Sequence, residues 1–207
     1  MRQGVLFVIF SMGTGGTQRN MVNIINNINL NNKNKILFLY NATKTSYLED
    51  QIDKSVKVYK VTSTSIIKHF FRLKELISII NNENISSIVS FAINGSYLAL
   101  ISKIILPFRK IPIIYRLVSI DSYLTYSRYF MLSNLKSFLY INILCRFVDS
   151  IICQSEYMYN SLVKQSPKLL IKKSLVIRNL IDTLRIDKNI DEDLNINFKY
   201  FIFLGRF

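Results

Sequence analysis

Residues 4–19 read GVLFVIFSMGTGGTQR, an apolar run followed by a glycine-rich turn. A short apolar run bounded by turn residues is typical of a strand that is buried on both faces of a parallel sheet. The residues beyond the turn are apolar at the spacing of one helical face: Met21, Val22, Ile24, Ile25 and Ile28. This stretch therefore predicts a strand, a turn and a helix, the first half of a βαβ unit.

The same alternation of apolar runs and helical periodicity continues along most of the chain. Strands are predicted over Gly4–Phe10, Lys35–Tyr40, Val56–Lys60, Ser86–Phe91, Ile111–Leu117, Ser150–Gln154 and Ser174–Ile177. Strands separated by helices form parallel sheets that are covered on both sides. We therefore expect an α/β fold, a Rossmann-like parallel sheet with helices on both faces.

One predicted helix, over residues 66–80, has a marked two-sided pattern. Its expected apolar face consists of Ile66, Ile67, Phe70, Phe71, Leu76, Ile77 and Ile80. The opposite face carries Lys68, His69, Arg72 and Glu75. Because polar residues gather on the solvent side of an amphipathic helix, we expect His69, the only histidine, to be solvated.

The chain divides into three predicted parts: a domain over 1–182, a linker over 183–198 and the beginning of a second domain over 199–207. The linker is polar and acidic and lacks a clear period. Residues 200–204 read as a buried strand that runs into Gly205 and Arg206. Since such a strand needs neighbours on both sides, we expect the second domain to be truncated.

The charge points to an anionic partner. The formal net charge of the 207 residues is +14, and residues 98–185 hold 13 Lys or Arg against 4 Asp or Glu. Candidate partners are nucleic acid, an acidic membrane and a phosphorylated ligand. No helix-turn-helix, RRM or zinc pattern accompanies the charge, so we expect no nucleic-acid partner. Apolar helices flanked by cations suit an anionic membrane surface, although they also suit packing on a sheet with solvated lysines.

Cysteine usage and hydropathy indicate a cytoplasmic protein. Cys145 and Cys153 both lie in apolar runs, which predicts buried thiols in a reducing compartment. The first apolar run is too short for a secretory signal, and no segment is long enough to span a membrane. We therefore expect a cytoplasmic protein that is at most peripheral on the membrane.

The glycine-rich turn, with Gly13, Gly15 and Gly16, lies where backbone amides at a helix N-terminus can face an anion. A tight turn that needs positive φ is the alternative explanation. Gln18 occupies the position of the third glycine of a dinucleotide fingerprint, and no Lys-Ser or Lys-Thr follows as in a P-loop. The turn therefore disfavours an NAD-dependent dehydrogenase and an ATPase, and favours contact with a phosphate or a sugar.

Four segments in order resemble family 4 glycosyltransferases: the strand and turn over 4–19, Ile151–Glu156, Val176–Asp182 and Phe203–Arg206. Members of that family have two Rossmann-like domains (the GT-B fold), use nucleotide-sugar donors and retain the anomeric configuration. The resemblance implies that this chain is the N-terminal, acceptor-side domain with the first strand of the donor-binding domain. It also implies no metal or other cofactor, because the nucleotide sugar is a substrate.

The resemblance implies donor- or acceptor-binding roles for eight residues. Gly15 and Gly16 would face the donor diphosphate and the acceptor, and Arg206 would pair with the diphosphate. Asn179 and Asp182 would shape the crossing between domains, unless they only form a turn. The remaining candidates are Thr17, Arg19 and Asn94.

The family often places a histidine just after the strand predicted here over Ile111–Leu117. This chain has Arg116 and Asp121 in that region, and we name them as candidate catalytic substitutes. A salt bridge at the surface is the other explanation for such a pair.

The function that the resemblance implies is sugar transfer from a nucleotide sugar to a glycan or lipid-linked acceptor, in the synthesis of cell-surface polysaccharide or lipopolysaccharide. Because the donor-binding groups of the family would lie beyond Phe207, we expect this chain to be inactive alone. The alternative is a non-catalytic module that binds an acceptor or a partner subunit and needs a separate donor-binding subunit.

Overall fold

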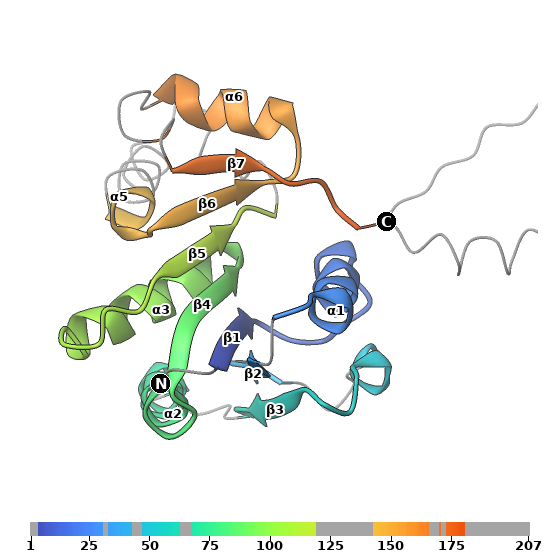
Figure 1. The fold of residues 1–207 in the computed structure, drawn as a ribbon, viewed down its shortest axis with the longest axis vertical. Coiled ribbons are helices and arrows are strands. Elements are labelled where there is room, and N and C mark those ends of the chain that lie inside the picture. The colour runs from blue at the N-terminus through green and yellow to red at the C-terminus, as the bar shows by residue number, and fades with distance from the viewer. Residues whose placement is uncertain are drawn as a thin grey trace, which may run out of the picture.

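The computed structural model describes residues 4–30, 33–42, 47–62, 68–118, 143–165, 170 and 173–180 (Figure 1). The predicted linker over 183–198 and the predicted second-domain strand over 199–207 lie outside these residues. Among the described residues, no helix is long and apolar enough to cross a membrane.

Seven strands form one sheet in the order β3-β2-β1-β4-β5-β6-β7, and all neighbouring pairs are parallel. The strands are β1 (Gly4–Ile9), β2 (Asn34–Leu39), β3 (Lys57–Lys60), β4 (Ile85–Phe91), β5 (Ile113–Arg116), β6 (Ser150–Cys153) and β7 (Ser174–Val176). Each lies within two residues of its predicted bounds. The predicted Rossmann-like parallel sheet is therefore confirmed.

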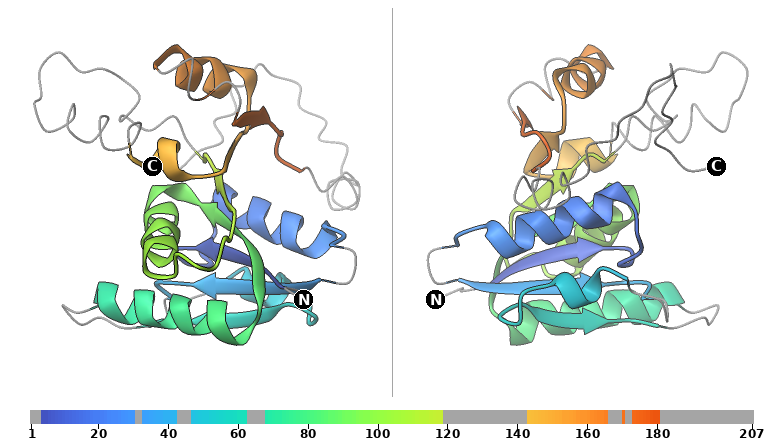
Figure 2. Two further views of the ribbon diagram at one scale, coloured as in Figure 1. Left: turned by 60° about the vertical axis from the view of Figure 1, so that its left-hand side comes forward. Right: turned by 90° about the vertical axis from the view of Figure 1, so that its right-hand side faces the viewer.

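Helices cover both faces of the sheet, as predicted (Figures 1 and 2). They are α1 (Gly16–Asn27), α2 (Lys68–Asn82), α3 (Ala92–Ile105), α5 (Cys145–Phe147) and α6 (Glu156–Gln165), with a 3-10 turn η1 (Glu49–Gln51). Helix α1 packs on one face, and α2 and α3 pack on the other. This arrangement follows from the period of two along the central strand: Val5, Phe7 and Ile9 face α1, whereas Leu6 and Val8 face the opposite side.

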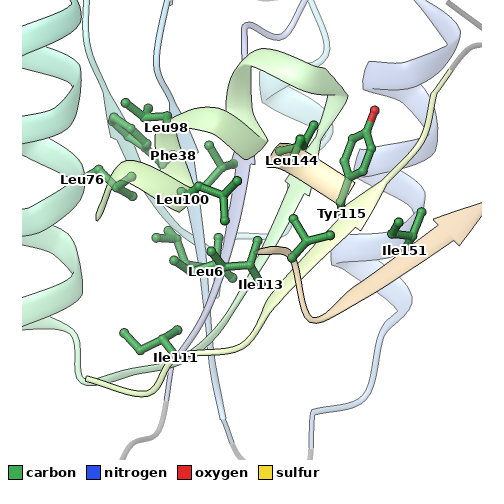
Figure 3. Close-up of a cluster of buried hydrophobic side chains, with 14 of the residues drawn as sticks. Leu6, Phe38, Leu76, Leu98, Leu100, Ile111, Ile113, Tyr115, Leu144 and Ile151 are labelled. Carbon is green, nitrogen blue, oxygen red and sulfur yellow. The ribbon is translucent and has the colours of Figure 1, made fainter. Parts of the chain in front are cut away.

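The larger core lies between the sheet and the α2–α3 layer (Figure 3). Leu6 and Phe38 from the sheet meet Leu76 from α2 and Leu98 from α3, and all but Leu98 are completely buried. The cluster continues along β5 and β6 to Ile151. Both thiols, Cys145 and Cys153, are buried, as predicted, and neither forms a disulfide. Burial raises the pKa of the Cys153 thiol to about 11, with a smaller contribution from the Glu156 carboxylate, so the thiol stays protonated and inert at neutral pH.

The predicted orientation of α2 is wrong at its first turns. Phe70 and Phe71, expected in the core, are 61% and 45% exposed, whereas Arg72, expected in solvent, is 5% exposed. The buried face runs through Arg72, Leu76, Ile79 and Ile80, which are spaced by four and three residues. The pattern of apolar residues was misleading because two aromatic side chains stand on the outer face.

The strand order reverses its direction at β1. The chain builds β1, β2 and β3 toward one edge and then returns to place β4 on the other side of β1. In open parallel sheets, ligands bind outside the carboxyl ends of the strands at such a switch point. A ligand site is therefore expected at the segments that follow β1 and β4.

Candidate functional site

The glycine-rich loop follows β1 at the switch point, and Gly15 caps the N-terminus of α1. No described glycine has a positive φ, so the explanation by a tight turn is wrong for this loop. Among the described residues, no atom lies within 4 Å of a Cβ atom built on Gly13 or Gly16. Neither the backbone nor the packing of that part of the chain requires glycine at these two positions, and the loop borders open space there.

Thr17 and Arg19 lie in the first turn of α1. The Arg19 amide donates to the Gly15 carbonyl at 3.1 Å, which closes that turn. The Arg19 side chain is exposed, and that of Thr17 is half-buried. The amides of Gly16 and Thr17 start the helix without a side-chain cap on Gly15. Helix N-termini attract anions because their first amides have no partner within the helix.

Asn94 lies at the start of α3, directly beyond β4. Ala92, two residues before it, has a φ of 63°, which is in the left-handed region that L-residues rarely adopt. The Ser96 hydroxyl donates to the Ala92 carbonyl at 3.1 Å and lies 2.6 Å from the Ser90 hydroxyl. These bonds hold the strained turn, which carries the exposed Asn94 side chain at the carboxyl edge of the sheet.

A hollow of about 380 Å³ opens between the carboxyl ends of β1 and β2 and the helices α2 and α3. Asn94 lines it, together with aromatic residues from four segments. The aromatic residues are Phe10, Tyr40, Phe70 and Tyr97. The Phe10 and Tyr40 rings meet edge to face with centroids 5.5 Å apart. His69, exposed as predicted, also lies on the rim.

Two functional candidates in this hollow, Tyr40 and Arg72, were missed by the sequence analysis. The guanidinium of Arg72 lies 5.6 Å from the centroid of the Tyr40 ring and donates to Asn41 Oδ1. Burial raises the pKa of the Tyr40 hydroxyl to about 12, and the Arg72 charge opposes this rise. Arg72 could have been found by its spacing, since it lies four residues before Leu76 and seven before Ile79 on the buried face.

Arg116, the last residue of β5, is 2% exposed, so a salt bridge at the surface is the wrong explanation for it. Its Nη2 atom donates to Asn179 Oδ1 at 3.0 Å and to the Ile177 carbonyl at 3.4 Å. Its buried Nε atom has no partner among the described residues. Burial lowers the pKa of the guanidinium, which nevertheless remains charged at neutral pH.

Asn179 joins three elements at this edge. Besides the bond from Arg116, its Oδ1 accepts a bond from Asn20 Nδ2 of α1 at 3.0 Å, and its Nδ2 donates to Gln154 Oε1 at 3.1 Å. Asn20 Oδ1 in turn accepts from the Leu180 amide at 3.3 Å. The structure therefore brings Arg116 and Asn179 together, while Asn94 lies at the hollow beyond β4.

The remaining predicted residues, Asp121, Asp182 and Arg206, lie outside the described residues. Within the described ranges there is no group of three or more His, Cys, Asp or Glu side chains that could hold a metal ion.

No protein-family model and no curated protein matches this chain. Solved structures do. Anabaena Alr3699/HepE in complex with UDP and glucose matches with a TM-score of 0.62 at 16% identity, over 89% of this chain and 50% of that one. A glycosyltransferase from Rickettsia africae ESF-5 matches with a TM-score of 0.57 at 13% identity, over 90% and 48%. A UDP-N-acetylglucosamine 2-epimerase from Rickettsia bellii matches with a TM-score of 0.56 at 14% identity, over 86% and 45%.

At these identities the similarity establishes the fold alone. The chain spans about half the length of the solved structures that it matches.

Proposed function

We propose that this chain is the acceptor-side domain of a retaining glycosyltransferase that transfers sugar from a nucleotide sugar to a glycan or lipid-linked acceptor. The transfer would serve the assembly of cell-surface polysaccharide or lipopolysaccharide. Because the chain spans about half of its structural neighbours, we propose the activity for a protein that contains both halves. In that protein the donor nucleotide would be held mainly by the other half.

The observation that carries the proposal is the open space beside the glycine-rich loop at the switch point. The described part of the fold does not need glycine at positions 13 and 16, and both border space in which a ligand could approach the backbone. Gly16 is also the first residue of α1, so the N-terminus of that helix adjoins this space, which suits a diphosphate. The hollow beyond β4, with Asn94 on its rim, would hold the acceptor sugar a short way along the same edge.

The network around Asn179 supports a second part of the proposal. Asn179 follows β7, and the bonds to Asn20 and Arg116 hold this exit segment against α1 and β5. A rigid exit would set the position of whatever follows it in the chain. Arg116, predicted as a catalytic substitute, is proposed here as a positioning residue for Asn179, because its guanidinium is buried beneath that amide.

We also propose that an anionic membrane surface is a partner. On the outer side of α3 and the following turn, Ile104, Ile105 and Phe108 are 76%, 48% and 96% exposed. Lys103 precedes them in the sequence, and Arg109 and Lys110 follow. Lys103 pairs with Asp149 at 2.7 Å, so the complementarity to acidic lipid headgroups would come mainly from Arg109 and Lys110. Ile101, one turn earlier on α3, also lines the hollow, so a lipid-linked acceptor could reach it from the membrane.

Amide chemical shifts of the isotope-labelled chain test the ligand site directly, since they detect weak binding by one half of an enzyme. Addition of a UDP-sugar should shift the amides of Gly13, Gly15 and Gly16, and uridine without phosphate should not. Gly16→Ala should reduce these shifts without lowering the melting temperature, because its Cβ enters open space. Shifts that avoid the loop altogether would contradict the proposal.

The reaction itself is tested by joining this chain to a donor-binding half and supplying nucleotide sugars with lipid extracts. The expected product is a glycolipid with the anomeric configuration of the donor. Conversion of UDP-N-acetylglucosamine to its epimer without any acceptor would instead favour an epimerase, a class that also occurs among the structural neighbours. Vesicles with and without acidic lipids test the membrane partner, and Phe108→Ser should weaken binding to the acidic ones.

A further inference from the structure

The hollow between the carboxyl ends of β1 and β2 and the helices α2 and α3 combines two chemical surfaces. One is aromatic and apolar, formed by Phe10, Tyr40, Phe70 and Tyr97. The other is polar, formed by Asn94, His69 and Arg72. Its volume of about 380 Å³ is in the range of small-molecule sites, which are mostly apolar with a few placed polar groups. This composition suits a sugar ring, with its flat C–H face on an aromatic ring and its hydroxyls on the amide and the imidazole.

Arg72 is unusual among these residues because it is a buried cation that has no counter-ion within the described part of the chain. It is 5% exposed, and among the described residues no carboxylate forms an ion pair with it. Segments 43–46 and 63–67, which adjoin β2 and α2 in the sequence, contain no Asp or Glu. Since arginine cannot become neutral in a protein, the charge persists in this environment.

The bonds that Arg72 makes leave part of its guanidinium unused. Nη2 donates to Asn41 Oδ1, and the plane lies near the Tyr40 ring. The Nε atom is buried and has no hydrogen-bond partner among the described residues. This donor is shut off from solvent, so what an anionic group in the hollow would balance is the charge of Arg72 rather than its Nε atom.

A structural role alone does not account for this arrangement. If Arg72 served only to tie α2 to the segment after β2, a neutral donor could make the same bond to Asn41 without the cost of burying a charge. The cation is placed against an open hollow rather than inside a closed core. Arginine is the side chain that recognises carboxylate and phosphate with two parallel bonds.

We infer that the hollow binds a sugar that carries an anionic group, a carboxylate or a phosphate, and that Arg72 recognises this group. That the ligand is a sugar rests on the proposed function, and that it carries a negative charge rests on the buried cation Arg72. The acceptor would therefore belong to the acidic sugars, either uronic acids or sugar phosphates. Neutral hexoses would be poor ligands because they leave the guanidinium unpaired.

Binding of matched sugars to the full 207-residue chain tests the inference. The probes are glucose, galactose and mannose, each compared with its uronic acid and its 6-phosphate, with inorganic phosphate and acetate as anions without a sugar. Calorimetry or ligand-observed NMR gives the affinities. At least one acidic sugar should bind ten times or more tightly than its neutral parent, and whether it is the uronic acid or the 6-phosphate identifies the anionic group.

Variants on α2 separate recognition from packing and from general charge. Arg72→Met keeps the length and apolar stem, and it should abolish the preference for the acidic sugar while leaving the weak binding of neutral sugars. Arg72→Lys keeps a charge and should retain part of the preference. Lys74→Met, an exposed cation two residues away, removes the same charge and should change nothing. Melting temperatures of all three variants show whether each remains folded. If Arg72→Met does not fold, a reduced preference for the acidic sugar in Arg72→Lys still tests the role of Arg72.

Three results would overturn the inference. Equal binding of neutral and acidic sugars would show that Arg72 does not recognise an anionic group, and it would leave the proposed function in place. Inorganic phosphate binding as tightly as a sugar phosphate would show that the hollow recognises the anion and not the sugar. Absence of binding by every sugar, with the loop amides still shifted by a UDP-sugar, would show that the hollow is not the acceptor site.

Discussion

The Oδ1 atom of Asn179 lies 3.0 Å from the Nη2 atom of Arg116, and this bond joins two residues that are 63 positions apart. Asn179 stands three residues beyond the end of β7, and Arg116 is the last residue of β5. Because the same oxygen also accepts from Asn20 of α1, the exit segment is fixed to two elements at once. The sequence also allowed Asn179 to be only a turn residue. In the structure it connects the segment after β7 to α1 and to the carboxyl end of β5.

Asn179→Ala should lower the free energy of unfolding by about 1–3 kcal/mol, because it leaves Arg116 with fewer acceptors in a buried position. Urea denaturation measures the change. Arg178→Ala, an exposed neighbour in the same segment, is the matched control and should stay within about 0.5 kcal/mol of the parent chain. Equal effects of the two variants would show that the network does not stabilise the fold.

Tyr40 should make stability depend on pH in the alkaline range. Burial, partly offset by Arg72, raises the pKa of its hydroxyl from 10.0 to about 12 in the folded chain. The neutral phenol therefore stabilises the fold fully below pH 10, and this contribution of about 2–3 kcal/mol is lost as the pH rises from about 10 to about 12.

The measurement is the free energy of unfolding of the parent chain and of Tyr40→Phe across that range. Other tyrosines and lysines titrate there in both proteins, so the difference between the two curves isolates Tyr40. The parent should lose more stability than the variant as the pH rises. Parallel curves would mean that the Tyr40 hydroxyl ionises equally well in the folded and unfolded chains.

Gly4 and Gly95 should respond in opposite directions to alanine. A Cβ on Gly4 would stand 2.9 Å from the Glu83 carbonyl oxygen and 2.9 Å from Ile36 Cδ1, so Gly4→Ala should cost about 1–3 kcal/mol. A Cβ on Gly95 would stand 3.4 Å from the Val8 carbonyl oxygen, an ordinary contact. Because Gly95 lies within α3, Gly95→Ala should be neutral or stabilise by up to about 1 kcal/mol. Thermal unfolding of both variants decides the matter, and the reverse order would contradict the close packing at the start of β1.

Ala92 should tolerate glycine better than a branched residue. Its φ of 63° costs an L-residue about 1–2 kcal/mol, which glycine avoids. Glycine also gains freedom in the unfolded chain, so Ala92→Gly should leave stability unchanged or raise it by less than about 1 kcal/mol. Ala92→Val should lower it by more than about 1 kcal/mol, since a branched Cβ is hard to place at positive φ. Urea denaturation of the two variants provides the comparison, and a stable Ala92→Val would show that the turn can relax.

Most of the sheet was predictable because buried parallel strands leave a local signal. Residues 4–9 are apolar throughout, 36–39 are four apolar residues in a row, and 85–91 hold four apolar residues and three serines; turns or helices separate these runs. The glycine-rich loop was predictable for the same reason, since it lies between a strand and a helix that each have a recognisable pattern of apolar residues. The buried face of α2 was predicted wrongly because Phe70 and Phe71 are apolar but exposed, although the spacing of Arg72 from Leu76 and Ile79 fits the face that is buried.

The sequence by itself determined the fold class, the seven strands and the position of the glycine-rich loop, since each depends on neighbours within a few residues. Only the tertiary structure decided that Arg72 enters the hollow beside Tyr40 and that Arg116 lies beneath Asn179. Both contacts join residues 32 or more positions apart, and their partners are chosen by strand order and helix packing. The presence of an arginine in the sequence could not predict these contacts, because the residue type does not show whether its side chain is buried or solvated.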